Sequence, residues 1–337
     1  SPMRRPTTAL VVIAALVVAV ALALRTNAST TDEGTTASSA PSATTAPTSP
    51  SSTAPTTSSS LPEATIPSPG VPACDLYDEI VVTGSVESTV LVEASGLAVS
   101  RTANDVLWSH NDSRGDASLF AFDRTGSDLG TFAIPDAFAI DWEDMAAGPD
   151  ATGSMPYLYV GDIGDNFGIR AGVINVWRVP DLDPRELTDA FPESVALVYR
   201  MPDGPYDAEA LFVDPLEPAL YIVSKDRDQA FVFKGSLEST GTTQDMELVA
   251  TLFLGGEVSG ADITPDGQII AFRGYDTVWM WNRLPGQSIA EALLAEPCTA
   301  PSPDERQGES IAFGDRWGYY TISEGTTPAI NYVPSGR

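Results

Sequence analysis

The segment Asp141-Trp-Glu-Asp-Met-Ala146 decides the fold, because related versions of it recur four more times along the chain. In each copy, acidic or small polar residues come directly before apolar or small ones. The other copies are Glu93-Ala-Ser-Gly-Leu-Ala98, Asp207-Ala-Glu-Ala-Leu-Phe212, Ser259-Gly-Ala-Asp-Ile-Thr264 and Gln307-Gly-Glu-Ser-Ile-Ala312. Their first residues lie 48, 66, 52 and 48 positions apart, a spacing typical of repeat architectures.

Each copy is followed by further β-type runs that are separated by turns rich in Gly, Asp or Pro. A second run covers residues 106–110, 158–162, 221–225, 269–273 or 320–324, and a third covers 119–122, 173–177, 231–233, 278–281 or 330–333. Several units add a fourth run, such as 194–199. Four short strands in about 50 residues are typical of a propeller blade. The sequence therefore predicts an all-β, five-bladed β-propeller, or a six-bladed one if one repeat has diverged beyond recognition.

The last unit ends after its third strand, so the ring needs a strand from elsewhere. Residues 79–83, which precede the first repeat, form a β-type run that can supply it beside residues 330–333. This closure brings the two ends of the domain together. Cys74 and Cys298, the two cysteines of the chain, lie near those ends, and we expect them to form a disulfide in an oxidising compartment.

The N-terminal part has a different composition from the repeats. Residues 1–26 are predicted to be a signal peptide or signal anchor, because Arg4 and Arg5 precede the apolar run 9–24. A poor small-residue cleavage site favours an uncleaved anchor, which would leave everything after Arg25 outside the cytoplasm. Residues 27–73 are rich in Ser, Thr and Pro and predict a disordered stalk. Residues 74–337 then form an extracytoplasmic propeller domain, membrane-anchored or secreted, in the cell envelope.

The chain carries a formal net charge of −28, and all of it belongs to the propeller part, which contains 15 basic and 43 acidic residues. Nucleic acid and anionic lipid surfaces are therefore poor partners for this domain. We expect a monomeric ectodomain that binds a small polar ligand or a cell-envelope component. Strong acidity is also compatible with divalent-cation binding or simply with a well-solvated surface.

Aligning the repeats groups ionisable residues at equivalent positions. The first strand of each unit starts with Glu93, Asp141, Asp207, Ser259 or Gln307, and two places later it has Ser95, Glu143, Glu209, Ala261 or Glu309. A period of two places both sets on one face. The second run ends at His110, Asp162, Lys225, Arg273 or Glu324. The predicted ligand pocket at one channel mouth comprises Glu93, His110, Glu143, Asp162, Glu209, Lys225, Arg273, Glu309 and Glu324. The alternative is that these residues form inter-blade ion pairs and turns.

Two turns, residues 110–113 and 161–166, are rich in Asp and Asn. Calcium takes 6–8 oxygen ligands of this kind, although Asp and Asn also build turns without any metal. The candidate metal ligands are Asp112, Asp141, Asp162, Asp165, Asn166 and Asp207, with calcium as the candidate ion. A zinc site with two or three histidines is excluded, because His110 is the sole histidine of the chain.

Several longer motifs together resemble a known group. They are Ser95-Gly-Leu97, Trp108-Ser-His-Asn-Asp112, Asp141-Trp-Glu-Asp144, Tyr159-Val-Gly-Asp-Ile-Gly-Asp-Asn166, Asp207-Ala-Glu-Ala-Leu211 and Ser224-Lys-Asp226. Over residues 93–324 the chain resembles a widespread group of exported bacterial propeller proteins, which is distantly similar to esterase-like phytases and SdiA-regulated propellers. The resemblance implies a propeller fold, export and calcium as a candidate ligand, but no reaction. The sequence departs from phytase-like enzymes in offering only Lys225, Arg273, Arg170 and Arg227 as evident anion ligands.

Three functional hypotheses follow. The first is a membrane-tethered extracytoplasmic binding module with calcium or a small polar ligand at the charged mouth. The second is a calcium-dependent hydrolase of phosphate esters or lactones, in which the metal polarises the substrate, Lys225 and Arg273 hold an anion, and His110 or a carboxylate is the general base. The third is a structural or adhesive cell-surface protein that uses the outer surface of the propeller.

Overall fold

A computed structural model describes residues 72–336 apart from 113–115, 167 and 315. The predicted signal or anchor segment, and all of the predicted stalk except its last two residues, lie outside the described residues. Within the described part, no helix has both the length and the apolar character needed to cross a membrane.

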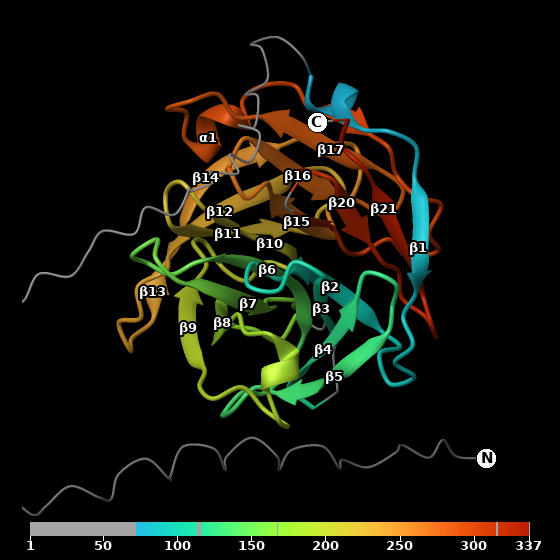
Figure 1. The fold of residues 1–337 in the computed structure, drawn as a ribbon. Helices are drawn as coiled ribbons and strands as arrows, with labels where there is room; N and C mark the ends of the chain where they lie inside the picture. The colour runs from blue at the N-terminus through green and yellow to red at the C-terminus, as the bar shows by residue number, and fades with distance from the viewer. Residues whose placement is uncertain (1–71, 113–115, 167, 315, 337) are drawn as a thin grey trace, which may run out of the picture. The chain divides into compact units, whose positions relative to one another are not determined.

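The five repeats form five separate sheets, numbered here as blades 1 to 5 in chain order (Figure 1). Blade 1 contains β2 (Ala94–Val99), β3 (Val106–Asn111), β4 (Ser118–Asp123) and β5 (Asp128–Ala133). Blade 2 contains β6 (Trp142–Pro149), β7 (Pro156–Asp162), β8 (Val173–Pro180) and β9 (Val195–Arg200). Blade 3 contains β10 (Ala208–Asp214), β11 (Ala219–Ser224), β12 (Ala230–Ser236) and β14 (Glu247–Leu252).

Blade 4 contains β15 (Gly260–Ile263), β16 (Ile269–Arg273), β17 (Val278–Asn282) and β18 (Cys298–Ala300). Blade 5 contains β19 (Ala312–Phe313), β20 (Tyr319–Thr321), β21 (Ala329–Val333) and, from the other end of the chain, β1 (Val81–Ser85). The described part of the chain also contains three short helices: η1 (Ala73–Leu76), η2 (Pro184–Glu186) and α1 (Ile289–Ala292). A two-residue strand, β13 (Gln244–Asp245), pairs in parallel with β9 and extends blade 2 outward. The five-bladed prediction is confirmed.

The ring closes where the sequence predicts. β1 pairs antiparallel with β21, with Val81 opposite Tyr332 and Ser85 opposite Ala329, so the closing strand begins two residues later than predicted. The predicted disulfide between Cys74 and Cys298 is confirmed, and their Cα atoms lie 6.0 Å apart. The disulfide joins η1, which precedes the closing strand, to β18 of blade 4, so it ties the N-terminal segment to the blade next to the one that β1 completes.

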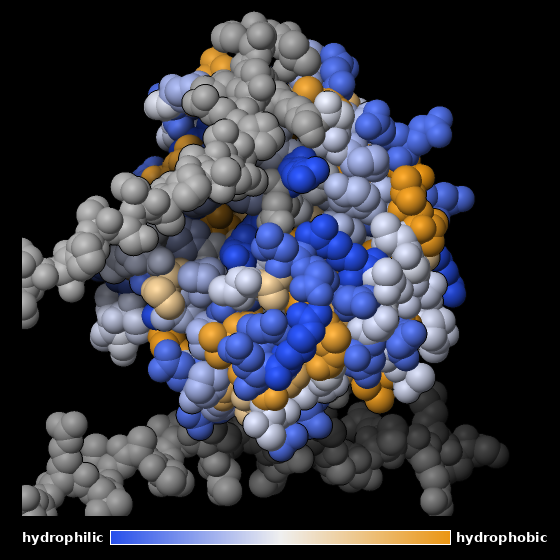
Figure 2. Space-filling view, in the orientation of Figure 1, coloured by the Kyte–Doolittle hydropathy of each residue, from blue (hydrophilic) through white to orange (hydrophobic). Residues whose placement is uncertain are grey.

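The hydrophobic core is divided among the interfaces between blades. Five clusters of buried side chains occur, and each one joins two neighbouring blades. Between blades 1 and 2, for example, Trp108 and Trp142 are both almost fully buried. Burying one large apolar side chain stabilises a fold by roughly 1.5–3 kcal/mol. Because these side chains are buried between blades, a blade without its neighbours would lose this stabilisation and would not fold alone. On the face shown in Figure 2, the described surface is mostly hydrophilic, with apolar residues scattered over it.

Candidate metal centre

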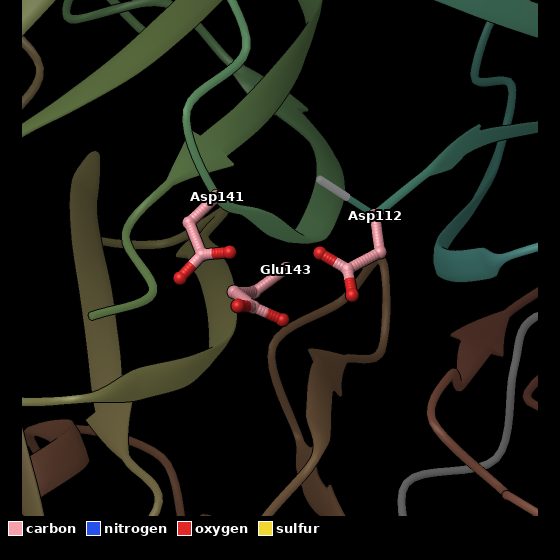
Figure 3. Close-up of side chains that lie close together, drawn as sticks. All are labelled: Asp112, Asp141 and Glu143. Atoms are coloured by element: carbon pink, nitrogen blue, oxygen red, sulfur yellow. The ribbon is translucent and has the colours of Figure 1, made fainter. Parts of the chain in front are cut away.

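Three carboxyl groups converge at one end of the inner strands of blades 1 and 2. Asp112 follows β3, Asp141 directly precedes β6, and Glu143 lies within β6. One carboxylate oxygen from each lies within 4.8 Å of the corresponding oxygens of the other two. Asp141 and Glu143 are each only 3% exposed, and Asp112 is partly buried. Figure 3 shows the carboxyl group of Glu143 between those of the two aspartates. We call these three residues the triad.

A β-bulge positions Glu143. Trp142 pairs with Asp162 and Asp144 pairs with Gly161, so Glu143 is the extra residue in β6. The same irregularity occurs between Ala208 and Ala210, where Glu209 is the extra residue. Bulges re-aim side chains and often occur beside functional sites. The strict period of two that the sequence analysis assumed is therefore interrupted at this end of the strands.

The turn after β7 folds over the triad. The backbone N–H of Asn166 donates to Asp141 Oδ2 at 3.2 Å, and its side-chain amide lies 3.4 Å from Glu143 Oε1. A Cβ on Gly164 would come within 2.0 Å of Glu143 Oε1, so only glycine allows this close approach. In the same turn, Asp165 accepts the backbone N–H groups of Ile169 and Arg170 through Oδ1.

The electrostatics of the triad are dominated by burial and like charge. Burial, together with the neighbouring carboxylates of Glu209, Asp112, Asp141 and Asp207, raises the pKa of Glu143 to about 11. A buried carboxyl group surrounded by other carboxyl groups keeps its proton unless a cation approaches. This end of the channel therefore favours a positively charged ligand.

The other half of the mouth contains a lysine. Lys225 forms an ion pair with Glu209 at 2.7 Å and lies over the ring of Tyr275. Burial raises the pKa of Glu209 to about 7 although Lys225 lowers it. Burial also raises the pKa of Glu309 to about 8, with Glu324 as the next contributor. The mouth thus has two halves. The carboxyl groups on blades 1 and 2 are arranged as metal ligands, and those of Glu209 and Glu309 on blades 3 and 5 have raised pKa values.

The residues predicted to end the second strands do not share one position. The inner strands pair with Asn111 in blade 1, Asp162 in blade 2, Ser224 in blade 3 and Arg273 in blade 4, and an isolated bridge adds Ser323 in blade 5. Asp112, Lys225 and Glu324 come one residue later, whereas His110 comes one residue earlier than Asn111. Side chains alternate along a strand, so these positions face different surroundings. The assumption that the five ionisable residues form a single column is wrong.

Three of the predicted pocket residues are engaged by neighbouring groups. Asp162 pairs with Arg170 and accepts the backbone N–H of Asp141, so it lies behind the triad. Arg273 is buried and pairs with Glu305 at 2.8 Å. His110 is fully buried, and its ring contacts Trp142 edge-on. Two of the three are thus in ion pairs, Asp162 within blade 2 and Arg273 with the segment that connects blades 4 and 5, whereas His110 makes a ring contact between blades 1 and 2.

His110 has a further constraint. Burial lowers its pKa to about 4, so the ring is neutral at physiological pH. The His110 ring packs directly against Gly96 of the inner strand in the same blade. A Cβ on Gly96 would lie only 2.6 Å from His110 Nε2. Glu93, in contrast, is exposed, and its carbonyl oxygen accepts the backbone N–H of Asp112 at 2.8 Å. Asp207 accepts the backbone N–H of Asp165 at 2.7 Å.

The comparisons with known proteins find only distant structural similarity. No protein-family model matches the chain, and no curated protein sequence matches it. An aldose sugar dehydrogenase from Streptomyces coelicolor, solved with PQQ bound, aligns at 14% identity and a TM-score of 0.45 over 76% of this chain and 98% of that one. A gluconolactonase from Xanthomonas campestris aligns at 11% identity and 0.44, over 76% and 89% of the two chains. The calcium-binding protein regucalcin from Agrobacterium tumefaciens aligns at 11% and 0.41, over 76% and 96%.

Similarity this low carries no information about the site, whose chemistry has to come from its own residues. The propeller part of the resemblance noted from the motifs is confirmed by the five blades. The closer relationship, to exported propellers similar to esterase-like phytases and SdiA-regulated proteins, stays a prediction.

Two buried aspartates were missed by the sequence analysis. Asp144 accepts the backbone N–H of Met145 at 2.8 Å, of Leu211 at 2.8 Å and of Ala261 at 3.0 Å. Asp262 accepts the N–H of Ile263 at 2.8 Å and of Phe313 at 2.7 Å. The signal was available, because the fourth position of the repeats reads Gly96, Asp144, Ala210, Asp262 and Ser310. Because the other three residues at this position are small, they leave room for the two aspartate side chains to reach the neighbouring inner strands.

Proposed function

We propose that this protein is an extracytoplasmic propeller that binds a divalent cation, calcium, through the triad of Asp112, Asp141 and Glu143. The observation that carries the proposal is the convergence of three carboxyl groups, two of them buried, within 4.8 Å of one another. The charged groups that raise the pKa of Glu143 are all carboxylates. A divalent cation would neutralise this charge and compensate for its burial.

Calcium fits the donor set better than other common ions. Three carboxylates supply three to six oxygens, and calcium takes six to eight at 2.3–2.6 Å in irregular geometry. The side-chain amide of Asn166 lies beside Glu143 with its nitrogen toward Oε1, and a turn of the amide about its bond would bring its oxygen to the same place. Zinc prefers nitrogen and sulfur ligands, but His110 is packed against Trp142 and both cysteines are joined in the disulfide. The remaining coordination positions suit the oxygens of a small polar ligand or of a cell-envelope component.

The proposed location follows from two features. The disulfide indicates an oxidising compartment. The apolar run after Arg4 and Arg5 supports export and, on the stalk of residues 27–73, a tether to the membrane. In this proposal the propeller presents its acidic mouth to solutes outside the cytoplasm.

A second candidate is a metal-dependent hydrolase of lactones or phosphate esters, which the Glu209–Lys225 pair favours. Burial raises the pKa of Glu209 to about 7, which is suitable for a general base at neutral pH. Lys225 could then hold the developing negative charge of the substrate while a bound metal polarises it. Arg273 and His110 do not take part in this version, because Glu305 and Trp142 already engage them.

The test is calcium titration of the purified full-length chain after chelation, followed by calorimetry and thermal unfolding. At a calcium concentration of 100 times Kd, the folded state gains about 2.7 kcal/mol, or roughly 5–10 °C in a domain of this size. Glu143→Gln should weaken calcium binding at least about 100-fold, because a neutral amide replaces a buried ligand. Glu238→Gln, an exposed acidic position on blade 3, is the matched control and should change nothing.

Two outcomes separate the candidates. Calcium binding without turnover of lactones or phosphate esters supports the binding module. Calcium-dependent turnover that Glu209→Gln abolishes, with calcium binding retained, supports the hydrolase. A melting temperature indifferent to calcium, magnesium, manganese and zinc would contradict both.

A further inference from the structure

A second pocket lies at the opposite end of the inner strands from the triad. Asp141 directly precedes β6, whereas Pro149 ends it, so the two ends lie roughly 25 Å apart at about 3.3 Å per residue. The pocket occupies about 240 Å³ between the turns that follow the first strands of blades 2, 3 and 4. Its lining includes Arg101, Pro149, Met155, Val213, Pro215 and Pro265.

The repeat explains why this pocket is apolar. Pro149 and Pro215 are each the eighth residue after the first position of their repeat, and Pro265 lies in the corresponding turn of blade 4. Proline has no N–H group, so these turns present rings instead of hydrogen-bond donors. Blade 1 has Arg101 at the eighth position, where blades 2 and 3 have proline. A single cationic side chain thus joins a wall of otherwise mostly apolar residues.

Arg101 retains hydrogen-bonding capacity toward the pocket. Its Nη1 donates to the backbone oxygen of Phe313 in blade 5 at 3.0 Å, which fixes the side chain across the end of the channel. In the described part of the chain, its guanidinium makes no ion pair within 4.0 Å and no other hydrogen bond. None of its nitrogens is both buried and without a partner, so the remaining N–H groups are accessible to solvent, and Arg101 lines the pocket.

The nearest carboxylates are already engaged by other donors. Asp181 accepts the hydroxyl of Ser100 at 2.8 Å and the backbone N–H of Arg101. Asp262 accepts the backbone N–H groups of Ile263 and Phe313. The negative charges of Asp181 and Asp262 partly offset the positive charge of Arg101. Neither carboxylate accepts a hydrogen bond from its guanidinium group, which can therefore donate to a ligand.

We propose that this pocket binds a small monocarboxylate with an apolar body, such as an aryl or branched-chain acid. A guanidinium matches a carboxylate with two parallel hydrogen bonds, while proline, valine and methionine side chains cover an apolar group. A cavity of about 150 Å³ can hold benzene, so about 240 Å³ accommodates a ring with its carboxylate. Polyanions are disfavoured, because a single arginine faces the pocket and the chain carries a net charge of −28. This site is independent of the proposed metal centre.

The test uses benzoate as the probe and the full-length chain in the presence of a chelator. Met155 is 56% exposed and lines the pocket, so its methyl signal in ¹³C-methyl NMR reports binding directly. We expect a saturable shift of that signal by benzoate and an affinity at least about tenfold lower for benzyl alcohol, which lacks the charge. The methyl group of Met201, buried between blades 2 and 3, should not move.

Variants locate the binding. Arg101→Gln should weaken benzoate at least about tenfold, and Arg101→Lys should restore part of the affinity. Arg178→Gln is the matched control, since Arg178 also donates to one backbone oxygen, that of Leu237, but lies outside the pocket. If Arg101→Gln does not fold, the comparison of benzoate with benzyl alcohol on the unaltered chain decides. The proposal is overturned if the Met155 signal does not saturate, if both probes bind equally, or if Glu143→Gln abolishes binding, which would place benzoate at the triad.

Discussion

The two ends of the propeller channel are built from the same five strands but have opposite chemistry. At the mouth, Asp112, Asp141 and Glu143 gather negative charge around a buried carboxyl group. At the other end, proline rings and one arginine surround an apolar pocket. The difference teaches that the repeat fixes the strand pairing, whereas the residues just before and just after each inner strand remain free to carry different sites.

Asp144 and Asp262 separate the two ends. Each carboxylate accepts backbone N–H groups from its own inner strand and from a neighbouring one. These donors hold the two carboxyl groups in place, although burial still raises the pKa of both. The same residue type therefore stabilises the fold in the middle of the channel and creates a site at its mouth.

The largest effect is expected at Asp144, and it separates these two roles. Asp144→Ala leaves three backbone N–H groups without their acceptor, so we expect a loss of about 3–5 kcal/mol in the free energy of unfolding. Asp141→Asn at the mouth should cost less than about 1 kcal/mol in the metal-free protein, because it relieves like-charge repulsion. Urea unfolding of both variants in a chelator measures the difference. Equal losses would show that the mouth is as structural as the centre.

An intermediate effect is expected from pH. Burial and Glu324 raise the folded-state pKa of Glu309 to about 8, above its ordinary value of 4.5. The folded state therefore binds this proton more tightly than the unfolded state. The resulting stabilisation is complete below about pH 4.5 and is lost as the pH rises through 8.

We therefore expect the chelated protein to unfold more easily at pH 8 than at pH 5. Glu309→Gln should reduce that difference by up to about 3.5 kcal/mol, because roughly two and a half pH units of linked protonation lie between pH 5 and pH 8 and each corresponds to about 1.4 kcal/mol. Thermal unfolding across this pH range provides the measurement, with Glu238→Gln as the exposed control. A stability profile that Glu309→Gln leaves unaltered would show that the carboxylates of the mouth are ionised and compensated in the folded chain.

The smallest effect is expected at the Glu209–Lys225 pair. A double-mutant cycle with Glu209→Gln and Lys225→Met should give a coupling energy of about 1 kcal/mol, since Lys225 is partly exposed to solvent. Lys225→Met should also strengthen calcium binding a few-fold, because removing a nearby positive charge favours the cation. Weaker calcium binding in this variant would mean that Lys225 supports the metal centre rather than opposing it.

The order of the elements was predictable because the repeat is periodic. The five first strands, the closure by a strand before the first repeat and the Cys74–Cys298 bridge all follow from spacing and from the incomplete last unit. The two-residue shift of the closing strand was not predictable, because the β-type run that begins near residue 79 marks a strand without fixing its ends.

The site was predictable only in part. The sequence indicated that Asp112, Asp141 and Glu143 lie near one mouth, and the structure brings these three together. It did not predict the bulges that insert Glu143 and Glu209, because a bulge changes side-chain direction without changing composition. Sequence alignment likewise did not fix the register of the second strands, so His110, Lys225 and Glu324 were assigned to the position that only Asp162 and Arg273 occupy.

The sequence by itself determined the number of blades, their order and the acidic character of the chain, because these depend on repetition and composition. The tertiary structure alone decided which carboxylates accept backbone N–H groups from neighbouring inner strands. Asp144 and Asp262 meet backbone N–H groups of neighbouring strands, whereas Glu143 meets other carboxylates. That outcome depends on distances across the channel between residues 50 to 120 positions apart, such as Asp144 and Ala261, and no local pattern encodes such distances.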